Sequence, residues 1–384
     1  MSVPCVMLVA AEPSGDALGA ALAAALKARR DLRLVGVGGP LMTKEGVESS
    51  FDITPLSVLG VFDALAAYPM VRRRARELGE LAAREKPDIA VLIDSWGFNL
   101  RVAHAIRRVC PDTPLIKFVA PQVWATRPGR ARTLARAVDH LLTIHAFDAP
   151  WFEKAGLPTT FVGNPVLSQR PAPADPQRLR TAIGAAPGAP VLVVAPGSRR
   201  REVERLLGPF GDAARLLVAE RPHMKVVVLA AEAVADTLAA RVKGWPFDVH
   251  VSLDEAERRD AMAAATAALA CSGTVTTELG LAGAPVVVGY RLDPPTAAIA
   301  RMLIRTPYIT LMNVAAGREV APELLQSACV GPCLAAALAP LLDDPDARAR
   351  QVAAQTAALT IMRGGIDDPA GAAADAVLAR LPSG

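Results

Sequence analysis

The stretch from Ala264 to Gly289, AATAALACSGTVTTELGLAGAPVVVG, constrains the fold of this chain more than any other. A short apolar run is followed by a Ser-Gly-Thr turn, a helical pattern of apolar residues and a second β-rich run. This order predicts a strand, a tight turn, a helix and another strand. That is the repeating unit of a parallel α/β sheet.

The start of the predicted helix is a candidate anion site. Ser272 and Thr274 are favoured N-cap residues, and Gly273 permits a sharp turn. The free N–H groups and the dipole of such a helix start attract anions. Glu278 lies about one turn further, where a carboxylate suits the hydroxyls of a ribose. The pattern therefore indicates a nucleotide held by its diphosphate and ribose, with an ordinary capped helix as the alternative.

A second turn of this kind follows the apolar run Val191–Ala195. It reads Pro-Gly-Ser-Arg, so Ser198 and Arg199 come just before an amphipathic helical pattern that begins at Glu202. A strand, a small turn and an arginine at a helix start again predict an anion site. Here the guanidinium adds a fixed cation that can bind a diphosphate through two hydrogen bonds.

The length of 384 residues exceeds that of one typical core and favours two domains. Strands alternate with helices in both halves, which predicts two Rossmann-like parallel α/β domains with ligands in the cleft between them. We expect an acceptor-side domain over residues 1–166 and a nucleotide-binding domain over 167–345. Residues 346–384 are predicted as C-terminal helices, one of which can cross back to the first domain.

Several classes of function are disfavoured. The glycine-rich turn at residues 36–40 lacks the third glycine of a dinucleotide fingerprint, because Leu41 occupies that position. Aromatic residues make up only 4% of the chain, which disfavours base-stacking surfaces for nucleic acid. The five cysteines form no paired C-x-x-C motif, so we expect reduced thiols in a cytosolic protein. No apolar run reaches the length of a membrane span, and the N-terminus is predicted as a first strand.

Asp94 is the candidate catalytic base. It follows Ile89–Ile93, a fully apolar run typical of a buried parallel strand. Ligands of open α/β sheets bind at the carboxyl ends of the strands, so a carboxylate there can accept a proton from a hydroxyl. The alternative is that Asp94 caps the next helix.

A basic cluster, Arg72, Arg73 and Arg74, follows the apolar segment Leu56–Leu65. Apolar surface beside arginines can lie on an anionic membrane. A core helix with a solvated basic end is the alternative.

Taken together, these motifs resemble the lipid-A-disaccharide synthases, a family of bacterial glycosyltransferases, over residues 6 to 326. The residues that carry the resemblance are Ala11–Asp16, Gly36–Pro40, Glu45-Gly46, Ile93-Asp94, Phe98-Asn99, Pro121, Val123–Ala125, Pro196–Arg199, Glu202-Val203, Ser272–Thr274, Glu278, Val287–Arg291, Asn313, Ala316–Glu319 and Glu323–Gln326. Each match is weak alone, but their order and spacing together are specific.

The resemblance implies a GT-B fold and a defined reaction. The donor would be UDP-2,3-diacylglucosamine and the acceptor 2,3-diacylglucosamine 1-phosphate. The products would be UDP and a β-1,6-linked disaccharide 1-phosphate, formed with inversion at the anomeric carbon. The family implies no cofactor and no required metal, no nucleic-acid partner, and a cytoplasmic enzyme peripheral to the inner face of the inner membrane. The oligomeric state cannot be inferred.

The resemblance also implies roles for individual residues. Asp94 would be the general base, and Arg199 would offset charge on the departing UDP. Ser198, Ser272, Gly273, Thr274 and Glu278 would complete the UDP site. The acceptor side or cleft would be lined by Glu12, Ser14, Asn99, Gln122, Trp124 and Asn313. In this light Arg72, Arg73 and Arg74 become candidates to face the membrane.

Two positions depart from the family pattern. Gly97 stands where the family often has a second Asp, and Thr126 replaces a Trp. Neither position lies in the UDP-binding half. Three alternatives stay open: another UDP-sugar-dependent lipid glycosyltransferase, a UDP-sugar epimerase, and a catalytically silent UDP-sugar-binding protein.

Overall fold

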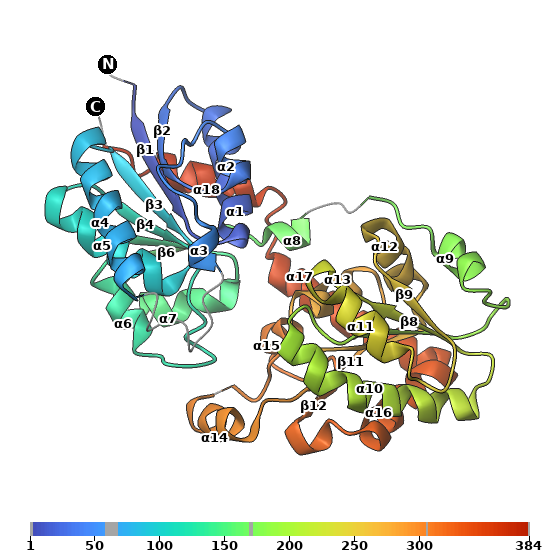
Figure 1. The fold of residues 1–384 in the computed structure, drawn as a ribbon. Helices are drawn as coiled ribbons and strands as arrows, with labels where there is room; N and C mark the ends of the chain where they lie inside the picture. Colours follow the sequence, from blue (N-terminus) through green and yellow to red (C-terminus); the bar gives the residue numbers. More distant parts are fainter. Residues whose placement is uncertain (1–2, 58–67, 169–171, 305, 383–384) are drawn as a thin grey trace. The chain divides into compact units, whose positions relative to one another are not determined.

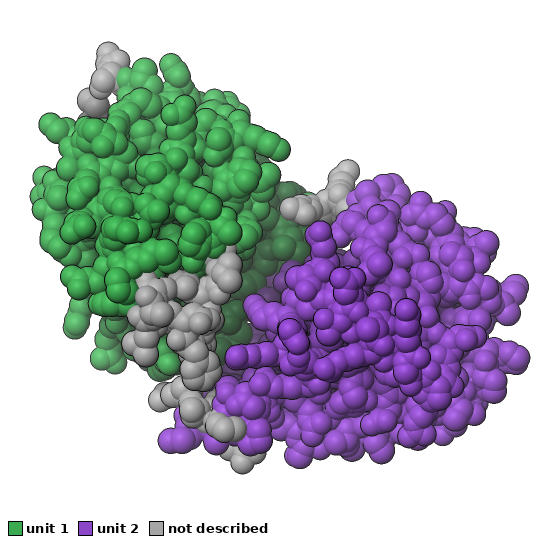
Figure 2. Space-filling model, viewed as in Figure 1, with its two compact units in different colours: residues 1–169, 363–384 green, residues 170–362 purple. Residues whose placement is uncertain are grey.

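The computed structural model describes residues 3–57, 68–168, 172–304 and 306–382. The chain divides into two compact units (Figure 2). Unit 1 comprises residues 1–169 and 363–384, and unit 2 comprises residues 170–362. The domain boundaries predicted from the sequence follow residues 166 and 345. The structure divides it after 169 and 362, and the last segment of the chain belongs to unit 1.

Unit 1 is built on a parallel sheet with the strand order β2-β1-β3-β4-β5-β6 in its described residues (Figure 1). The strands are β1 (Cys5–Ala10), β2 (Arg33–Val37), β3 (Ile89–Ile93), β4 (Leu115–Phe118), β5 (His140–Thr143) and β6 (Thr159–Phe161). The helices are α1 (Pro13–Lys27), α2 (Pro40–Lys44), α3 (Thr54–Ser57), α4 (Tyr68–Glu85), α5 (Trp96–Val109), α6 (Arg130–Ala135), η1 (Ala146–Asp148), α7 (Ala149–Glu153), α8 (Pro165–Ser168) and α18 (Pro369–Leu378).

Both faces of this sheet are buried, as continuous apolar strands predict. Met7 and Val9 of β1 pack in a cluster with residues of α4 and α5. Leu8, from the opposite face of the same strand, packs with α1 and with Val377 of α18. Helix α18 contacts α1, so the C-terminal segment completes the core of unit 1 (Figure 1).

Unit 2 repeats the design with the strand order β12-β11-β10-β7-β8-β9 in its described residues. The strands are β7 (Val191–Ala195), β8 (Lys225–Leu229), β9 (Val249–Ser252), β10 (Ala267–Ala270), β11 (Val286–Tyr290) and β12 (Glu323–Leu325). The helices are α9 (Pro176–Ala182), α10 (Arg200–Glu220), η2 (Glu232–Val234), α11 (Ala235–Val242), α12 (Glu255–Ala264), α13 (Thr274–Leu281), α14 (Pro294–Leu303), α15 (Leu311–Ala316), η3 (Gln326–Ala328), α16 (Gly331–Asp343) and α17 (Pro345–Arg363).

Each sheet has one point where the strand order reverses. In unit 1 it lies between β1 and β3, and in unit 2 between β7 and β10. The connections that leave the two adjacent strands there run to opposite faces, which opens a crevice at their carboxyl ends. The turns after these four strands carry most of the motifs that the sequence analysis singled out. The fold therefore places a candidate site at the same topological position in each unit.

None of the helices in the described ranges combines the length and hydropathy needed to cross a bilayer. Most of the apolar segment Leu56–Leu65 lies outside the described residues. Leu56 itself is buried in unit 1.

Candidate active site

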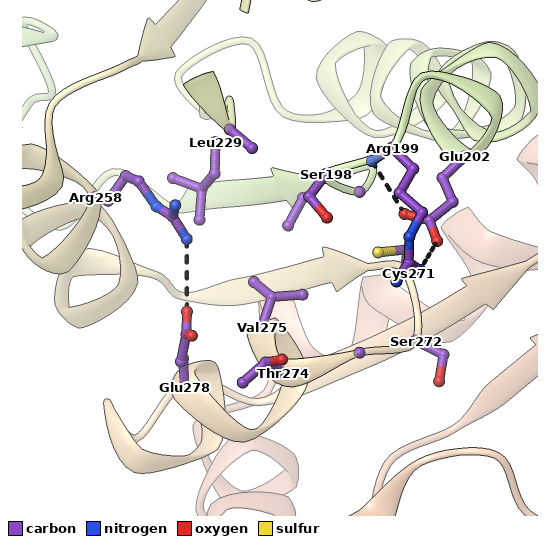
Figure 3. A pocket seen from close by; sticks show the side chains of 14 residues that line it. Ser198, Arg199, Glu202, Leu229, Arg258, Cys271, Ser272, Thr274, Val275 and Glu278 are labelled. Carbon is purple, nitrogen blue, oxygen red and sulfur yellow. Dashed lines mark hydrogen bonds and ion pairs between the residues drawn. The ribbon is translucent and has the colours of Figure 1, made fainter. Parts of the chain in front are cut away.

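The crevice between β7 and β10 holds a cavity of about 300 Å³ (Figure 3). All six residues predicted to bind UDP line it: Ser198, Arg199, Ser272, Gly273, Thr274 and Glu278. The first two follow β7 and the others follow β10. The parallel register that aligns Ala195 with Ala270 brings the two turns together.

The start of α13 differs from the prediction in its capping. The N-cap is Gly273, in an extended conformation, and no side chain caps the helix. The hydroxyl of Ser272 instead donates to the carbonyl of Ile309, at 3.3 Å. The prediction that Ser272 and Thr274 cap this helix is therefore wrong, because a residue distant in sequence takes up the serine hydroxyl. With no capping side chain over it, the helix start borders the cavity directly.

Arg199 lies at the N-cap of α10 and is held by Glu202. Its Nη1 donates to Oε1 of Glu202 at 2.9 Å, and its backbone N–H donates to Oε2 at 3.3 Å. Gly197, with φ of 121°, lets the turn pass close to Glu202, since a Cβ there would lie 2.6 Å from that carboxylate. The Arg199 side chain is 81% exposed, so it can swing from Glu202 to a ligand with little loss of packing.

Arg258 is a cavity residue that the sequence analysis missed. It comes from α12 and faces Glu278 across the cavity, with Nη2 3.5 Å from Oε2 (Figure 3). Burial raises the pKa of Glu278, while Arg258 lowers it and Glu255 raises it. The sequence around Arg258 is polar on both sides, and no pattern in it distinguishes Arg258 from Arg259 as a ligand-binding residue.

The remaining lining is apolar. Leu229 at the end of β8 and Val275 on α13 face the cavity near Arg258 and Glu278 (Figure 3). Cys271 also lines it, and burial raises its pKa to about 12, so the thiol stays protonated at neutral pH. The cavity thus combines cationic groups at two edges with apolar walls, a combination that suits a nucleotide.

At the corresponding crevice of unit 1, Asp94 follows β3 and Ser14 lies in the first turn of α1. The Ser14 hydroxyl donates to Oδ2 of Asp94 at 2.7 Å. Gly15 lies against the ends of β1 and β3: a Cβ there would make a tight contact of 3.3 Å with the Cβ of Ala10 and an ordinary contact of 3.5 Å with the Cβ of Asp94. Asp94 and Ser95 both adopt left-handed backbone conformations, with φ of 53° and 33°.

Asn99 is buried and hydrogen-bonded to the backbone of this turn. Its Nδ2 donates to the carbonyls of Ile93 and Asp94, at 2.7 and 2.9 Å, and the residue is 1% exposed. The prediction that Asn99 lines the acceptor site is therefore corrected: its amide is used to fix the backbone from which Asp94 projects. It is a positioning residue.

The other acceptor-side residues differ in accessibility. Glu12 precedes α1 and is half-buried, and Gln122 is exposed. Trp124 is buried, and its ring meets Phe147 edge to face at 5.4 Å, so it supports the region after β4 rather than offering a contact surface.

Asn313 belongs to unit 2 and is fully buried. Its Nδ2 donates to the Ala321 carbonyl and to Glu323, and its Oδ1 accepts from the N–H groups of Val320 and Ala321. All of its hydrogen bonds are made inside the unit. The prediction that Asn313 lines the cleft is corrected to a role in holding the loop before β12.

The arginines expected to face a membrane lie on α4. Arg72 and Arg73 are exposed. Both line an open groove of about 830 Å³ between α4 and α5, which also takes in Arg76, Arg101, His104 and Arg108. Arg74 differs: it pairs with Glu77 at 2.7 Å and lies over the Phe51 ring at 4.4 Å. Its side chain is therefore committed to unit 1.

The comparisons with known proteins are decisive for the family. The model of the family described as lipid-A-disaccharide synthetase matches residues 6–376. The chain belongs to this family. The lipid-A-disaccharide synthase of Rhodospirillum centenum is 42% identical over 375 residues, which cover 97% of this chain and 94% of that protein. The chain is accordingly a glycosyltransferase that forms the lipid A disaccharide, as the sequence analysis predicted.

Solved structures agree on the fold. The calicheamicin glycosyltransferase CalG4 matches with a TM-score of 0.56 and 19% identity, over 99% of each chain. The UDP-GlcNAc 2-epimerase from Neisseria meningitidis bound to UDP-GlcNAc matches with a TM-score of 0.60 and 12% identity, over 98% of this chain and 100% of that one. At these identities the likeness shows the fold alone. The predicted GT-B architecture is confirmed, and the substrates are of the classes that the family implies, a UDP-sugar and a lipid acceptor.

Proposed function

We propose that the enzyme transfers 2,3-diacylglucosamine from UDP to the 6-hydroxyl of 2,3-diacylglucosamine 1-phosphate. The observation that carries this proposal is the cavity of unit 2, where Arg199, Arg258 and the start of α13 surround one space. This arrangement suits a diphosphate. Glu278 on the same wall suits the ribose hydroxyls.

In the proposed reaction the 6-oxygen of the acceptor attacks the anomeric carbon of the donor, and the bond from that carbon to the UDP oxygen breaks. The hydroxyl proton passes to Asp94, and the configuration at the anomeric carbon inverts. Ser14 orients the Asp94 carboxylate through one oxygen. A positioned base of this kind contributes roughly 10²–10⁴ in rate.

The departing UDP carries the developing negative charge. Arg199 leaves Glu202 to pair with the diphosphate, and the N–H groups at the start of α13 add fixed dipoles. We propose that these groups stabilise the leaving group without a bound metal or cofactor. Because Asp94 belongs to unit 1 and the cavity to unit 2, turnover needs both units.

The test is UDP release from UDP-2,3-diacylglucosamine in detergent micelles, with and without 2,3-diacylglucosamine 1-phosphate. We expect release to require the acceptor, and Asp94→Asn to lower kcat by about two orders of magnitude or more. Ser14→Ala removes a partner of the carboxylate but keeps the base, so it should lower kcat less than Asp94→Asn does. UDP binding without acceptor-dependent release would mean another acceptor or a silent binding protein.

We also propose that unit 1 lies on the cytoplasmic face of the inner membrane through the groove between α4 and α5. The guanidinium carbons of Arg72 and Arg101 lie 5.9 and 5.1 Å from the centre of the Tyr68 ring. Cations beside an aromatic ring suit the boundary between headgroups and acyl chains. Both substrates carry acyl chains, so the enzyme has to meet them at a membrane.

This membrane proposal predicts that Arg72→Glu/Arg73→Glu weakens binding to anionic vesicles by tenfold or more, because each basic residue near the surface contributes about 1 kcal/mol. Co-sedimentation with phosphatidylglycerol-containing vesicles measures the effect. Arg30→Glu/Lys154→Glu changes the net charge equally at exposed positions outside the groove and is the control. Equal binding by the groove variant and the wild type would refute the assignment of this face.

A further inference from the structure

A lysine lies fully inside unit 1, directly beneath the candidate base. Lys117 is on β4 and is 3% exposed. Its Nζ donates to the carbonyls of Leu92, Asp94 and Phe118. The distances to Leu92 and Phe118 are 3.3 and 3.1 Å. A buried ammonium is costly unless its three donors are satisfied, and here each of them has a carbonyl.

The Leu92 carbonyl lies within β3, and the other two belong to strained turns. The Asp94 carbonyl lies between Asp94 and Ser95, which both have positive φ, and the Phe118 carbonyl precedes Val119, whose φ is 73°. A β-branched residue rarely adopts that conformation. Such turns persist only where surrounding contacts determine them. Among the described residues, Lys117 is the one side chain that donates both to the turn after β3 and to the turn after β4.

The two turns are also joined to each other. The Asp94 N–H donates to the Phe118 carbonyl at 2.9 Å, so the backbone of the candidate base is hydrogen-bonded to the end of β4. The Asp94 carbonyl accepts two hydrogen bonds, one from Nδ2 of Asn99 at 2.9 Å and one from Nζ of Lys117. Losing the lysine would remove one hydrogen bond from the Asp94 carbonyl, which would keep Asn99, and one from the Phe118 carbonyl, which would keep the Asp94 N–H.

We propose that Lys117 is a positioning residue for Asp94, whose ammonium fixes the paired turns after β3 and β4 and so aims the carboxylate. The inference rests on the proposed role of Asp94 as base. Lys117 lies outside the family motifs, in the four-residue strand β4. In this proposal it acts through the backbone and does not touch the substrate.

The role has a pH dependence with a definite sign. The ammonium has three N–H donors and the neutral amine has two, so deprotonation removes the lysine hydrogen bond from one of the three carbonyls. Burial lowers the pKa of Lys117 to about 7, and the carboxylates of Asp94 and Glu12, the charged groups that face it, raise it. Positioning is therefore complete below this pKa and weakens as the pH rises through it.

The test compares Lys117→Met with the wild type in acceptor-dependent UDP release as a function of pH. Methionine keeps the unbranched shape and most of the length of the side chain but has no charge and no donor. We expect kcat to fall at least tenfold, while the Kd of UDP, whose cavity is in unit 2, stays within twofold. We expect the wild-type kcat to decline on the alkaline side, and this decline to be missing in the variant.

Two controls make the outcome unambiguous. Lys154→Met removes an exposed lysine from the same unit and should leave both profiles unchanged. Asp94→Asn tests the base itself: if it turns over like the wild type, the proposed function fails and not only the role of Lys117. If Asp94→Asn is inactive but Lys117→Met keeps the wild-type kcat and alkaline decline, only the inference about Lys117 is overturned.

Lys117→Gln is the second variant if Lys117→Met does not fold, as judged by circular dichroism and thermal unfolding. It has two N–H donors and no charge, so it imitates the neutral lysine. Its kcat should be reduced and flat on the alkaline side. A purely structural role would lower the unfolding temperature and the yield of active enzyme but keep the wild-type pH profile. If neither variant folds, the wild-type profile decides, because absence of an alkaline decline overturns the proposal.

Discussion

Arg258 and Arg259 are adjacent on α12, yet of these two described side chains only Arg258 lines the cavity. We expect Arg258→Ala to weaken UDP binding by roughly tenfold to a hundredfold, because a hydrogen bond to a charged group contributes about 1.5–3 kcal/mol. Titration calorimetry with UDP measures the change.

Arg259→Ala is the matched control for this prediction. Arg259 pairs with Glu255 on the same helix, at 3.6 Å, and does not line the cavity. Its replacement should leave the Kd of UDP unchanged. A wild-type Kd in Arg258→Ala would contradict the prediction. An equal loss in both variants would mean that α12 as a whole matters, rather than the Arg258 guanidinium.

At the scale of single residues, the sequence is sufficient to identify candidate site residues that directly follow strands. Asp94 and Arg199 could be proposed as site residues because the carboxyl end of a buried strand is a ligand site in this fold class. Lys117 and Arg258 could not be found in this way. Lys117 interrupts an apolar strand, and Arg258 lies in a polar stretch of helix. The roles proposed for both depend on contacts with residues that are distant in the sequence.

At the scale of elements, apolar periodicity was a good guide. The expected strand, turn, helix and strand around Ser272 appear as β10, α13 and β11. Capping was not predictable, because Ser272 bonds to a carbonyl 37 residues later in the chain. The start of the domain predicted over residues 167–345 contains helix α9, whose N-cap Asp175 also donates its backbone N–H to Asp260 of α12. Such tertiary contacts stabilise short helices that local propensity leaves marginal.

One residue of a family motif has a structural role. Asp16 of the first motif is buried, and its carboxylate accepts from the N–H groups of Gly39, Leu41 and Met42 at 2.8–3.0 Å. It thereby fastens the start of α2 to α1. Two motifs that look like parts of a ligand site from the sequence are thus joined to each other. The distance between them along the chain hides this relation.

For the whole molecule, the division into units follows the cores and not the order of the chain. Residues 363–384 return to unit 1, where Ala373, Ala374 and Val377 pack with Leu22 and Leu26 of α1. Cutting after residue 169 alone would expose that apolar surface. Unit 2, in contrast, is one continuous segment with its own six-stranded sheet and hydrophobic core.

This asymmetry predicts that residues 170–362 fold alone and bind UDP. All the residues of the cavity lie between Ala195 and Glu278, inside this segment. We expect its Kd for UDP to be within about threefold of that of the full chain, because no cavity residue is lost, and we expect no acceptor-dependent UDP release, because Asp94 is absent. Arg258→Ala in the fragment should weaken binding as in the full chain. A folded fragment that does not bind UDP would mean that unit 1 supplies part of the nucleotide site, and the assignment of the UDP site to unit 2 alone would be wrong.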